Sequence, residues 1–223
     1  MTTTRPRAPR RTDALSKERL VDAAIEVLDA EGEGALTFRA LATRLSTGSG
    51  AMYHYVANKD ELLKAATDAV IADVVNGGAQ PRDPSAAIRG LALGVFDAID
   101  AHPWVGTQLT REPWQFAIIQ LFERIGVQVQ ALGVPAAAQF DSASALVNYV
   151  LGLAGQYAAG ARLLARETDR TAFLGLIAAE WEKLDRHDFP FMHQMADGLD
   201  EHDDRAQFLA GIDLILAGIE STR

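Results

Sequence analysis

The chain has 223 residues, of which 48% are hydrophobic, and a formal net charge of −9. It contains no cysteine, so disulfides, cysteine-ligated zinc and thiol catalysis are excluded. No apolar run is long enough to span a bilayer and the N-terminus is polar, so we expect a cytoplasmic protein that is neither secreted nor membrane-embedded.

The charge is divided unevenly along the chain. Residues 1–72 hold ten Lys/Arg and ten Asp/Glu, whereas residues 73–223 hold eleven and twenty. Residues 1–15 form a basic arm, which we expect to be disordered because it lacks apolar residues at helical spacing. The arm is either a solvated tail or a segment that reaches the minor groove or the phosphates of DNA. Its arginines are Arg5, Arg7, Arg10 and Arg11.

Alanine, leucine and glutamate are plentiful and no long run of alternating β-branched residues occurs, which indicates an all-α fold. A first helix is predicted from its cap Ser16 to about Glu31. A second, short helix follows the cap Thr37. The run Ser46–Gly50 ends it, because hydroxyls compete with helical bonding and glycines turn at low cost. A third helix is predicted from about Ser49 to Val56, and a fourth from Asn58 to about Val75.

The predicted third helix carries three consecutive aromatic rings, Tyr53, His54 and Tyr55. A helix of about 3.6 residues per turn cannot bury all three, and Met52 and Val56 take the inward positions. Exposed rings that end in hydrogen-bonding groups suit phosphates and base edges. Two short helices joined by a tight glycine-containing turn are the form of a helix-turn-helix.

The stretch from Ser16 to about Asp68 resembles the DNA-binding domain of the TetR family of bacterial transcriptional repressors. It departs from the common pattern at Ser46-Thr47, where a glycine and an aliphatic residue are more usual. Glu61 follows Asn58 at the spacing of a capping box. The matching segments are Ala23-Ala24, Leu28, Gly34, Leu36-Thr37, Leu41-Ala42, Met52-Tyr53-His54-Tyr55-Val56 and Asn58-Lys59-Asp60-Glu61-Leu62-Leu63.

This resemblance implies nine DNA-contacting residues. By physical type, Arg39 and His54 suit base edges, and Ala51 suits a thymine methyl group. Phosphates suit Thr37, Tyr53, Tyr55 and Lys59, whereas Ser49 and Gly50 are small enough to let the backbone come close to DNA. For Tyr53 the alternative is partial packing against the first helix. The nine residues are Thr37, Arg39, Ser49, Gly50, Ala51, Tyr53, His54, Tyr55 and Lys59.

A boundary loop separates a first domain, residues 16–76, from a second domain, residues 84–223. Asp83 is predicted to cap the fifth helix, which begins at Pro84 and ends near Ala101. Further helices are predicted at about 104–109, 113–132, 135–166, 170–184 and 203–220, with a break at residues 189–191.

The long helix and the last helix are rich in small residues, which let another helix approach closely. The resemblance implies that this pair forms a four-helix bundle with the same pair of a second subunit. Such a homodimer presents recognition helices to successive major grooves, about 34–36 Å apart. The alternative is that both helices pack within the core of one chain. The small residues are Gly152, Ala154, Gly155, Ala158, Ala159, Gly160 and Ala161, with Gly211 and Gly218 in the last helix.

The second domain intersperses aromatic and polar side chains. A mostly apolar cavity with a few polar anchors suits a small-molecule effector, and the resemblance places it among the helices from Pro84 to Arg166. We expect no cofactor, and an unidentified effector that prefers the conformation not bound to DNA. The candidate ligand-binding residues are Phe96, Trp104, Gln108, Trp114, Phe122, Tyr149 and Gln156.

His187, His193 and His202 lie near several aspartates, which allows a metal site as one interpretation. Their spacing matches no i, i+4 histidine pair, so a solvated acidic loop is the simpler interpretation. No phosphate-binding glycine loop follows a strand and no nucleophile-elbow sequence occurs. We therefore predict no catalytic residues, no metal and no enzyme.

The sequence thus predicts a homodimeric, ligand-responsive DNA-binding regulator. We expect a repressor that binds a palindromic operator and is released by a small-molecule effector, without a membrane partner. One alternative is an activator on the same scaffold. Another is a helical small-molecule-binding protein or enzyme whose first domain merely packs and does not bind DNA.

Overall fold

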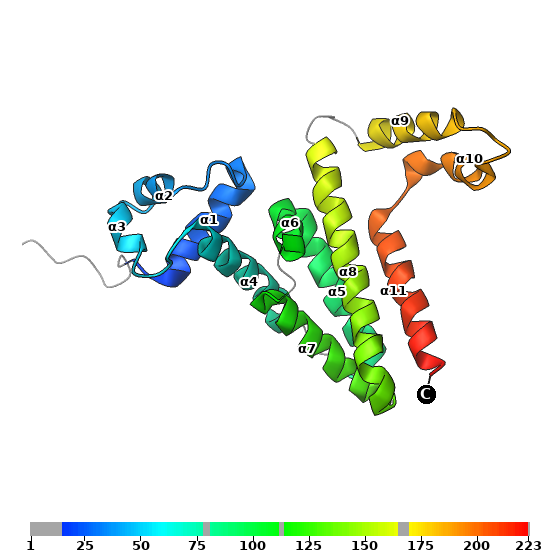
Figure 1. Cartoon of the computed structure of the whole chain (residues 1–223), viewed down its shortest axis with the longest axis horizontal. Helices are drawn as coiled ribbons and strands as arrows, with labels where there is room; N and C mark the ends of the chain where they lie inside the picture. The colour runs from blue at the N-terminus through cyan, green and yellow to red at the C-terminus, as the bar shows by residue number, and fades with distance from the viewer. Residues whose placement is uncertain (1–14, 78–80, 112–113, 165–169, 223) are drawn as a thin grey trace, which may run out of the picture. The chain divides into compact units, whose positions relative to one another are not determined.

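The computed structural model describes residues 15–77, 81–111, 114–164 and 170–222. Every regular element in these ranges is a helix, as the all-α prediction requires (Figure 1). The arginines of the predicted arm lie outside the described residues. None of the described helices combines the length and the apolar character that crossing a bilayer requires.

The chain divides into two compact units, one ending at Ala69 and the other beginning at Val70. The division falls inside one helix, α4 (Lys59–Gly77), whose first half belongs to one unit and second half to the other.

The first helix of the first unit is α1 (Lys17–Glu31). The hydroxyl oxygen of Ser16 accepts a hydrogen bond from the main-chain N–H of Arg19 at 3.2 Å, so Ser16 is the predicted cap. The pKa of the exposed Glu18 carboxyl is lowered, first by a hydrogen bond from the main-chain N–H of Glu18 itself and then by one from the Ser16 hydroxyl. Gly32, at φ 76°, ends the helix. The buried face consists of Leu20, Val21, Ala23, Ala24, Val27 and Leu28.

Two short helices follow, α2 (Phe38–Arg44) and α3 (Ser49–Met52). The Thr37 hydroxyl accepts from the main-chain N–H of Ala40 at 3.1 Å, which confirms Thr37 as a cap. The core beneath these helices is aliphatic and fully enclosed, so burial of apolar surface holds the unit together. Its most enclosed members are Leu20, Leu36, Leu41, Met52, Leu62 and Leu63.

The second unit begins with the end of α4 and continues with α5 (Pro84–Ala101), α6 (Pro103–Arg111), α7 (Phe116–Ala131) and α8 (Ala136–Leu164). The Asp83 carboxylate accepts from the main-chain N–H of Ala86 at 3.0 Å, as predicted for a cap followed by proline. The long helix α8 packs against α5, α6, α7 and α11, so it is the centre of this unit (Figure 1).

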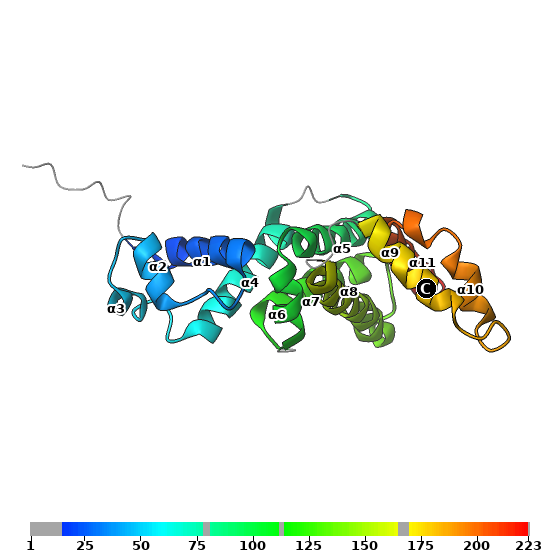
Figure 2. The same cartoon turned by 90° about the horizontal axis from the view of Figure 1, so that it is seen from above.

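The remaining helices are α9 (Arg170–Glu182), α10 (Pro190–Ala196), the 3-10 helix η2 (Leu199–Glu201) and α11 (Asp204–Glu220). Helix α11 packs on α5 and α8, whereas α9 packs mainly on α10 and η2 (Figure 2). An ion pair of 2.6 Å between Arg89 of α5 and Asp213 of α11 adds to the first of these contacts.

Two predicted boundaries differ from the structure, and the predicted end of the long helix at about Arg166 lies outside the described residues. The seventh helix begins at Phe116, where Gln115 precedes it in extended conformation, instead of at Pro113, which lies outside the described residues. Residues 189–191, predicted as a break, begin α10, because proline is well tolerated in the first turn of a helix. The long helix is described as far as Leu164.

Candidate DNA-binding surface and ligand cavities

The turn between α2 and α3 is tight. The main-chain N–H of Thr47 bonds to the oxygen of Ala42 at 3.0 Å, and Ser46 has φ 50°, which L side chains rarely adopt. Glycine would adopt this angle without strain, so the departure from the family pattern at this position has a visible cost in backbone geometry.

Helix α3 spans four residues, and the prediction that it continues to Val56 is wrong. Tyr53, His54 and Tyr55 lie in turns that are closed by hydrogen bonds from Tyr55 and Val56 back to the Met52 oxygen, at 2.9 and 3.1 Å. Asn58, a few residues later, caps α4. The predicted inward positions are confirmed, since Met52 and Val56 are 0% and 2% exposed.

The two tyrosines differ in their surroundings. The Tyr55 hydroxyl donates a hydrogen bond to the Leu15 oxygen at 2.7 Å and its ring is half-buried. Tyr53 is 60% exposed and packs edge-on against Phe38, with ring centroids 4.8 Å apart. The Tyr53 ring therefore packs on a residue of α2, Phe38, and most of its surface remains exposed.

The start of α4 is fixed from two sides. The Asn58 side-chain oxygen accepts from the Glu61 N–H at 2.8 Å, and the Glu61 carboxylate accepts from the Ala57 N–H at 2.6 Å. This is the predicted capping box, except that the Glu61 carboxylate accepts from the N–H of Ala57 instead of that of Asn58. The Lys59 ammonium donates to the Glu33 oxygen at 2.5 Å, so it also fastens α4 to the loop before α2.

The predicted DNA-contacting residues come from four neighbouring segments: the N-terminus of α2, helix α3, the turns after it and the start of α4. Arg39, Ser49, Gly50 and His54 are exposed. The side chains of Arg39 and His54 have no hydrogen-bond partner within the part of the chain that the structure describes. Exposed cationic and hydrogen-bonding groups without such a partner suit a polyanionic duplex.

Two cavities of ligand size are lined by described residues of the second unit. The first, which we call the α6–α8 cavity, measures about 710 Å³ and is lined by α6, α7 and α8. It includes two of the predicted ligand residues, Trp114 and Phe122, and the Phe122 ring lies 5.6 Å from that of Phe140. Trp114 and Phe140 are 84% and 70% exposed, so aromatic rings line an open mouth.

The polar lining of the α6–α8 cavity comes largely from one face of α8. Ser144 and Asn148 lie four residues apart, and Gly152 continues the same row. Neither Ser144 nor Asn148 has a side-chain hydrogen-bond partner among the described residues. Sequence reasoning did not identify Phe140, Ser144 or Gly152 as lining residues, although the spacing of the last two with Asn148 on an apolar helix is a usable signal.

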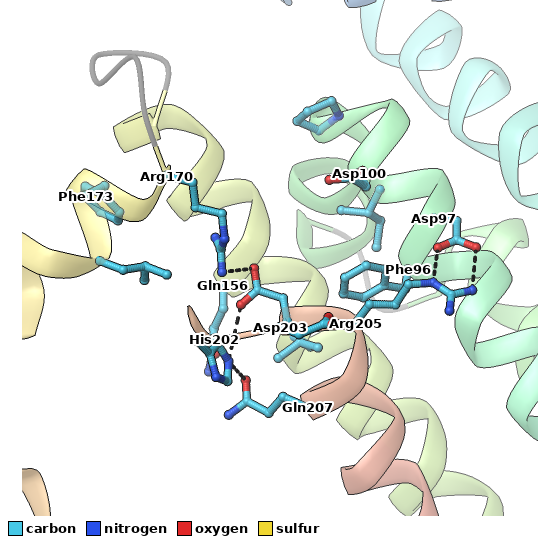
Figure 3. A pocket seen from close by; sticks show the side chains of 15 residues that line it. Phe96, Asp97, Asp100, Gln156, Arg170, Phe173, His202, Asp203, Arg205 and Gln207 are labelled. Atoms are coloured by element: carbon cyan, nitrogen blue, oxygen red, sulfur yellow. Dashed lines mark hydrogen bonds and ion pairs between the residues drawn. The ribbon is translucent and has the colours of Figure 1, made fainter. Parts of the chain in front are cut away.

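The second cavity, which we call the α9–α11 cavity, measures about 690 Å³ and lies between α5, α8, α9 and the start of α11 (Figure 3). It contains two other predicted residues, Phe96 and Gln156. Arg170 pairs with Asp204 at 2.5 Å, and Arg205 pairs with Asp97 at 2.9 Å (Figure 3). Hydrogen bonding to Asp97 raises the pKa of the Arg205 guanidinium.

The remaining three predicted ligand residues line neither cavity. Trp104 is 9% exposed, and the main-chain oxygen of the buried Gln108 accepts a hydrogen bond from the Gln115 side chain at 2.9 Å. Tyr149 stacks on Phe208, with centroids 5.6 Å apart and rings inclined by 9°, and burial raises the pKa of its phenol. The seven candidates are thus divided between two cavities and the core.

The histidines of the acidic segment have ordinary partners. The His193 ring nitrogen lies 2.8 Å from the Leu184 oxygen, and that of His202 lies 3.0 Å from the Gln207 side-chain oxygen. No three histidine or carboxylate side chains converge on a metal-sized position in the described ranges.

A helix-turn-helix unit followed by an all-α unit with ligand-sized cavities defines a class of proteins: regulators in which one chain contains a DNA-binding unit and a sensing unit. Comparison with known proteins agrees. Residues 20–66 match the bacterial regulatory proteins of the tetR family, and residues 78–223 match the tetracyclin repressor-like C-terminal domain. The chain therefore belongs to the TetR family of bacterial transcriptional regulators.

Individual relatives support this assignment. An HTH-type transcriptional regulator of Saccharopolyspora erythraea is 31% identical over 194 residues, which cover 79% of this chain and 81% of that protein. The solved structure of SCO7222, a TetR transcriptional regulator from Streptomyces coelicolor, is 49% identical with a TM-score of 0.81, covering 94% of this chain and 99% of that one. ActR of the same organism, in complex with actinorhodin, shares the fold at 24% identity and a TM-score of 0.73, covering 93% and 98% of the two chains.

Proposed function

We propose that this regulator is a repressor that binds a palindromic operator as a homodimer and leaves it when a small molecule occupies the α6–α8 cavity. The observation that carries the proposal is the outward surface of the helix-turn-helix, where Arg39 and His54 extend without partners in the described part of their subunit beside exposed Ser49 and Gly50. A repressor role is also supported by DrrR1 of Streptomyces coeruleorubidus, an HTH-type transcriptional repressor, which is 35% identical over 105 residues, covering 44% of this chain and 36% of that protein.

Dimerisation through α8 and α11 is supported by the outward face of α11. Leu214 is 76% exposed, and small exposed side chains flank it along the helix. A methyl group built at Gly218 of α11 meets nothing within 4 Å, so this position leaves room for another helix, whereas Gly152 of α8 lines the α6–α8 cavity. Gly211 is different, because Tyr149 of the same chain occupies the space beside it. Some of the small residues therefore leave room for a second subunit, and others pack within one chain. The side chains of Ala154 and of residues 157–164 lie outside those that the structure describes.

The dimer is tested by two leucine substitutions. Leu214→Arg is expected to convert the protein to a monomer in sedimentation equilibrium and to abolish operator binding, because a buried unpaired charge is costly. Leu176→Arg is the matched control, since Leu176 is also exposed, at 57%, but lies on α9. A dimer that survives Leu214→Arg would place the interface elsewhere.

The α6–α8 cavity is connected to α4 by two contacts within the second unit. Arg124 of α7 donates to the Asn76 side-chain oxygen at 3.1 Å, in the last turn of α4. A methyl group built at Gly94 of α5 lies 2.7 Å from Val74 of α4, so the two helices are in close contact. A ligand that displaces α7 therefore acts on α4, and DNA and ligand must weaken each other by the same factor.

The cavity is tested by filling it. Gly152→Phe projects a ring from α8 into space that is open in the structure. In a thermal-shift screen of aromatic compounds, hits that stabilise the wild-type protein are expected to lose their effect on this variant, while its operator affinity is retained. Hits that bind both proteins equally would exclude this cavity.

The decisive experiment for DNA binding is selection of bound duplexes from a random pool. We expect palindromic sequences whose half-sites repeat at about one helical turn or a multiple of it. Failure to enrich any sequence would favour the alternative, a helical ligand-binding protein or enzyme without DNA-binding activity. Transcription measured with and without the protein on the selected site separates repression from activation. We expect the protein to act in the cytoplasm, where the chromosome is accessible.

A further inference from the structure

The α9–α11 cavity is separate from the α6–α8 cavity, since the two share no lining residue. We propose that the α9–α11 cavity is a second ligand site, which binds a compact aromatic molecule that carries a protonated amine. Its volume of about 690 Å³ is within the range of small-molecule sites.

Apolar side chains from three helices form part of the cavity wall. Phe96 belongs to α5, Leu153 to α8, and Phe173 and Leu174 to α9. Figure 3 shows Phe96 and Phe173 on either side of the Arg170–Asp204 ion pair. Phenylalanine rings on two sides of a cavity favour an aromatic ligand, because ring contacts add to the free energy of apolar burial.

The charges of the cavity exclude an anion and favour a cation. Both arginines are already paired with carboxylates, Arg170 with Asp204 and Arg205 with Asp97. Asp203 caps α11 by accepting from the Ala206 N–H at 3.0 Å. The carboxylate of Asp100 has no partner in the described part of the chain. The lining thus carries four carboxylates, two guanidinium groups and the imidazole of His202, whose ring nitrogen lies 3.5 Å from an oxygen of Asp204. The carboxylates and guanidinium groups belong to Asp97, Asp100, Asp203, Asp204, Arg170 and Arg205.

A protonated amine would bind to the groups of the cavity that are not engaged in an ion pair. Its positive charge pairs with Asp100 and is also attracted to the faces of the phenylalanine rings. A carboxylate or phosphate in the same place would meet unpaired negative charge and would have to break an existing ion pair. The chemistry of the lining therefore selects by charge as well as by shape.

A ring contact connects the site to α8 and α11. The Phe96 ring stacks on Phe208 with centroids 5.3 Å apart, and Phe208 stacks on Tyr149. The Tyr149 hydroxyl donates to the Phe208 main-chain oxygen at 3.3 Å. A ligand that moves Phe96 therefore acts on the contact between α8 and α11. An effect on dimerisation rests on the proposed function above, whereas binding to the cavity does not.

Three probes with one ring system test the proposal on the full-length protein by isothermal titration calorimetry: 1-naphthylmethylamine, 1-naphthylmethanol and 1-naphthoate. We expect the amine to bind about fivefold more tightly than the alcohol and the naphthoate not to bind. Asp100→Asn is expected to remove the preference for the amine and to leave binding of the alcohol unchanged. Phe173→Ala is expected to weaken binding of both.

Two control variants locate the bound probe. Asp141→Asn removes an exposed carboxylate of α8 outside both cavities, and Gly152→Phe fills the α6–α8 cavity; neither is expected to change amine binding. Equal affinity for all three probes, absence of binding, or loss of binding in Gly152→Phe with none in Asp100→Asn would overturn the proposal. Circular dichroism of each variant establishes that the fold is retained, and operator binding, measured separately, tests the regulator itself.

Discussion

The Lys59 ammonium donates a hydrogen bond to the main-chain oxygen of Glu33 at 2.5 Å. This bond joins the first turn of α4 to the loop that precedes α2, two segments that are distant in sequence. Lys59 is half-buried, so part of the side chain stabilises the first unit while its charge remains near the expected path of the DNA backbone.

Lys59→Ala is therefore expected to have two effects. The free energy of unfolding should fall by about 1 kcal/mol because a hydrogen bond is lost. Affinity for all duplexes should fall alike, and the slope of log K against log salt should decrease by about one, because one phosphate contact is lost. Lys59→Gln, which keeps a donor without the charge, should recover stability but not the salt slope. A sequence-selective loss of affinity, or an unchanged slope, would contradict the phosphate contact.

The two tyrosines of the recognition region are expected to separate stability from DNA binding. Tyr55→Phe removes the hydroxyl that donates to the Leu15 oxygen at 2.7 Å, and should cost about 1 kcal/mol in urea unfolding. Tyr53→Phe removes an exposed hydroxyl, so it should leave stability unchanged and weaken operator binding in a fluorescence anisotropy assay. Equal effects of the two substitutions on stability would show that the hydrogen bond of Tyr55 contributes nothing.

The turn before α3 should be improved by glycine. Ser46 has φ 50°, and relief of this strain by Ser46→Gly is expected to raise the free energy of unfolding by about 1 kcal/mol. Ser46→Val should lower it, because a β-branched residue is worse still in this conformation. Chemical denaturation of the wild type and the two variants checks the order of their free energies of unfolding. A destabilised glycine variant would show that the Ser46 side chain stabilises the protein by more than the backbone strain at this residue destabilises it.

Two glycines of α5 form a matched pair. A methyl group at Gly94 would lie 2.7 Å from Val74, whereas one at Gly90 meets nothing within 4 Å. Gly94→Ala should therefore destabilise the protein by about 1–2 kcal/mol through overpacking and should alter the response to the effector. Gly90→Ala should stabilise it by up to about 1 kcal/mol, since alanine is the better helix former. If both variants are stabilised to the same extent, the close contact between α5 and α4 is not a constraint.

Alkaline stability should depend on Tyr149. Burial raises the pKa of this phenol above its usual value of 10.0, so the folded state retains the proton longer than the unfolded state does. The stabilisation is fully present below about pH 10 and is lost as the pH rises through the folded pKa. Tyr149→Phe should therefore reduce the loss of stability above about pH 10 in urea titrations, whereas Tyr53→Phe, which removes an exposed phenol, should not.

Features determined by neighbouring residues were predictable from the sequence. Ser16, Thr37 and Asp83 cap their helices as predicted, because a cap needs only a hydroxyl or carboxylate three residues before a free N–H. The length of α3 was not predictable. The turns after α3 place the Tyr55 hydroxyl on the main-chain oxygen of Leu15, forty residues away in the sequence. The periodicity of apolar residues gives no indication of so distant a contact.

The residues that line the cavities were also only partly predictable from the sequence. Nothing in the sequence distinguishes Trp104 from Trp114. Trp104 is enclosed in the core and Trp114 lies at the open mouth of the α6–α8 cavity, because the packing of α6, α7 and α8 determines which side chain is buried. The split of the candidates into two cavities depends on where α9 and α11 return to the unit, which is a tertiary property.

The side chains of Arg39 and His54 are exposed and take no part in the hydrogen bonds that hold the first unit together within its described residues. Mutation at these positions therefore leaves folding nearly untouched. If these two residues contact base edges as we predict, selection can change the operator sequence without a compensating change elsewhere in the first unit. Duplicate genes with this architecture can in this way acquire new target promoters and keep an old sensor.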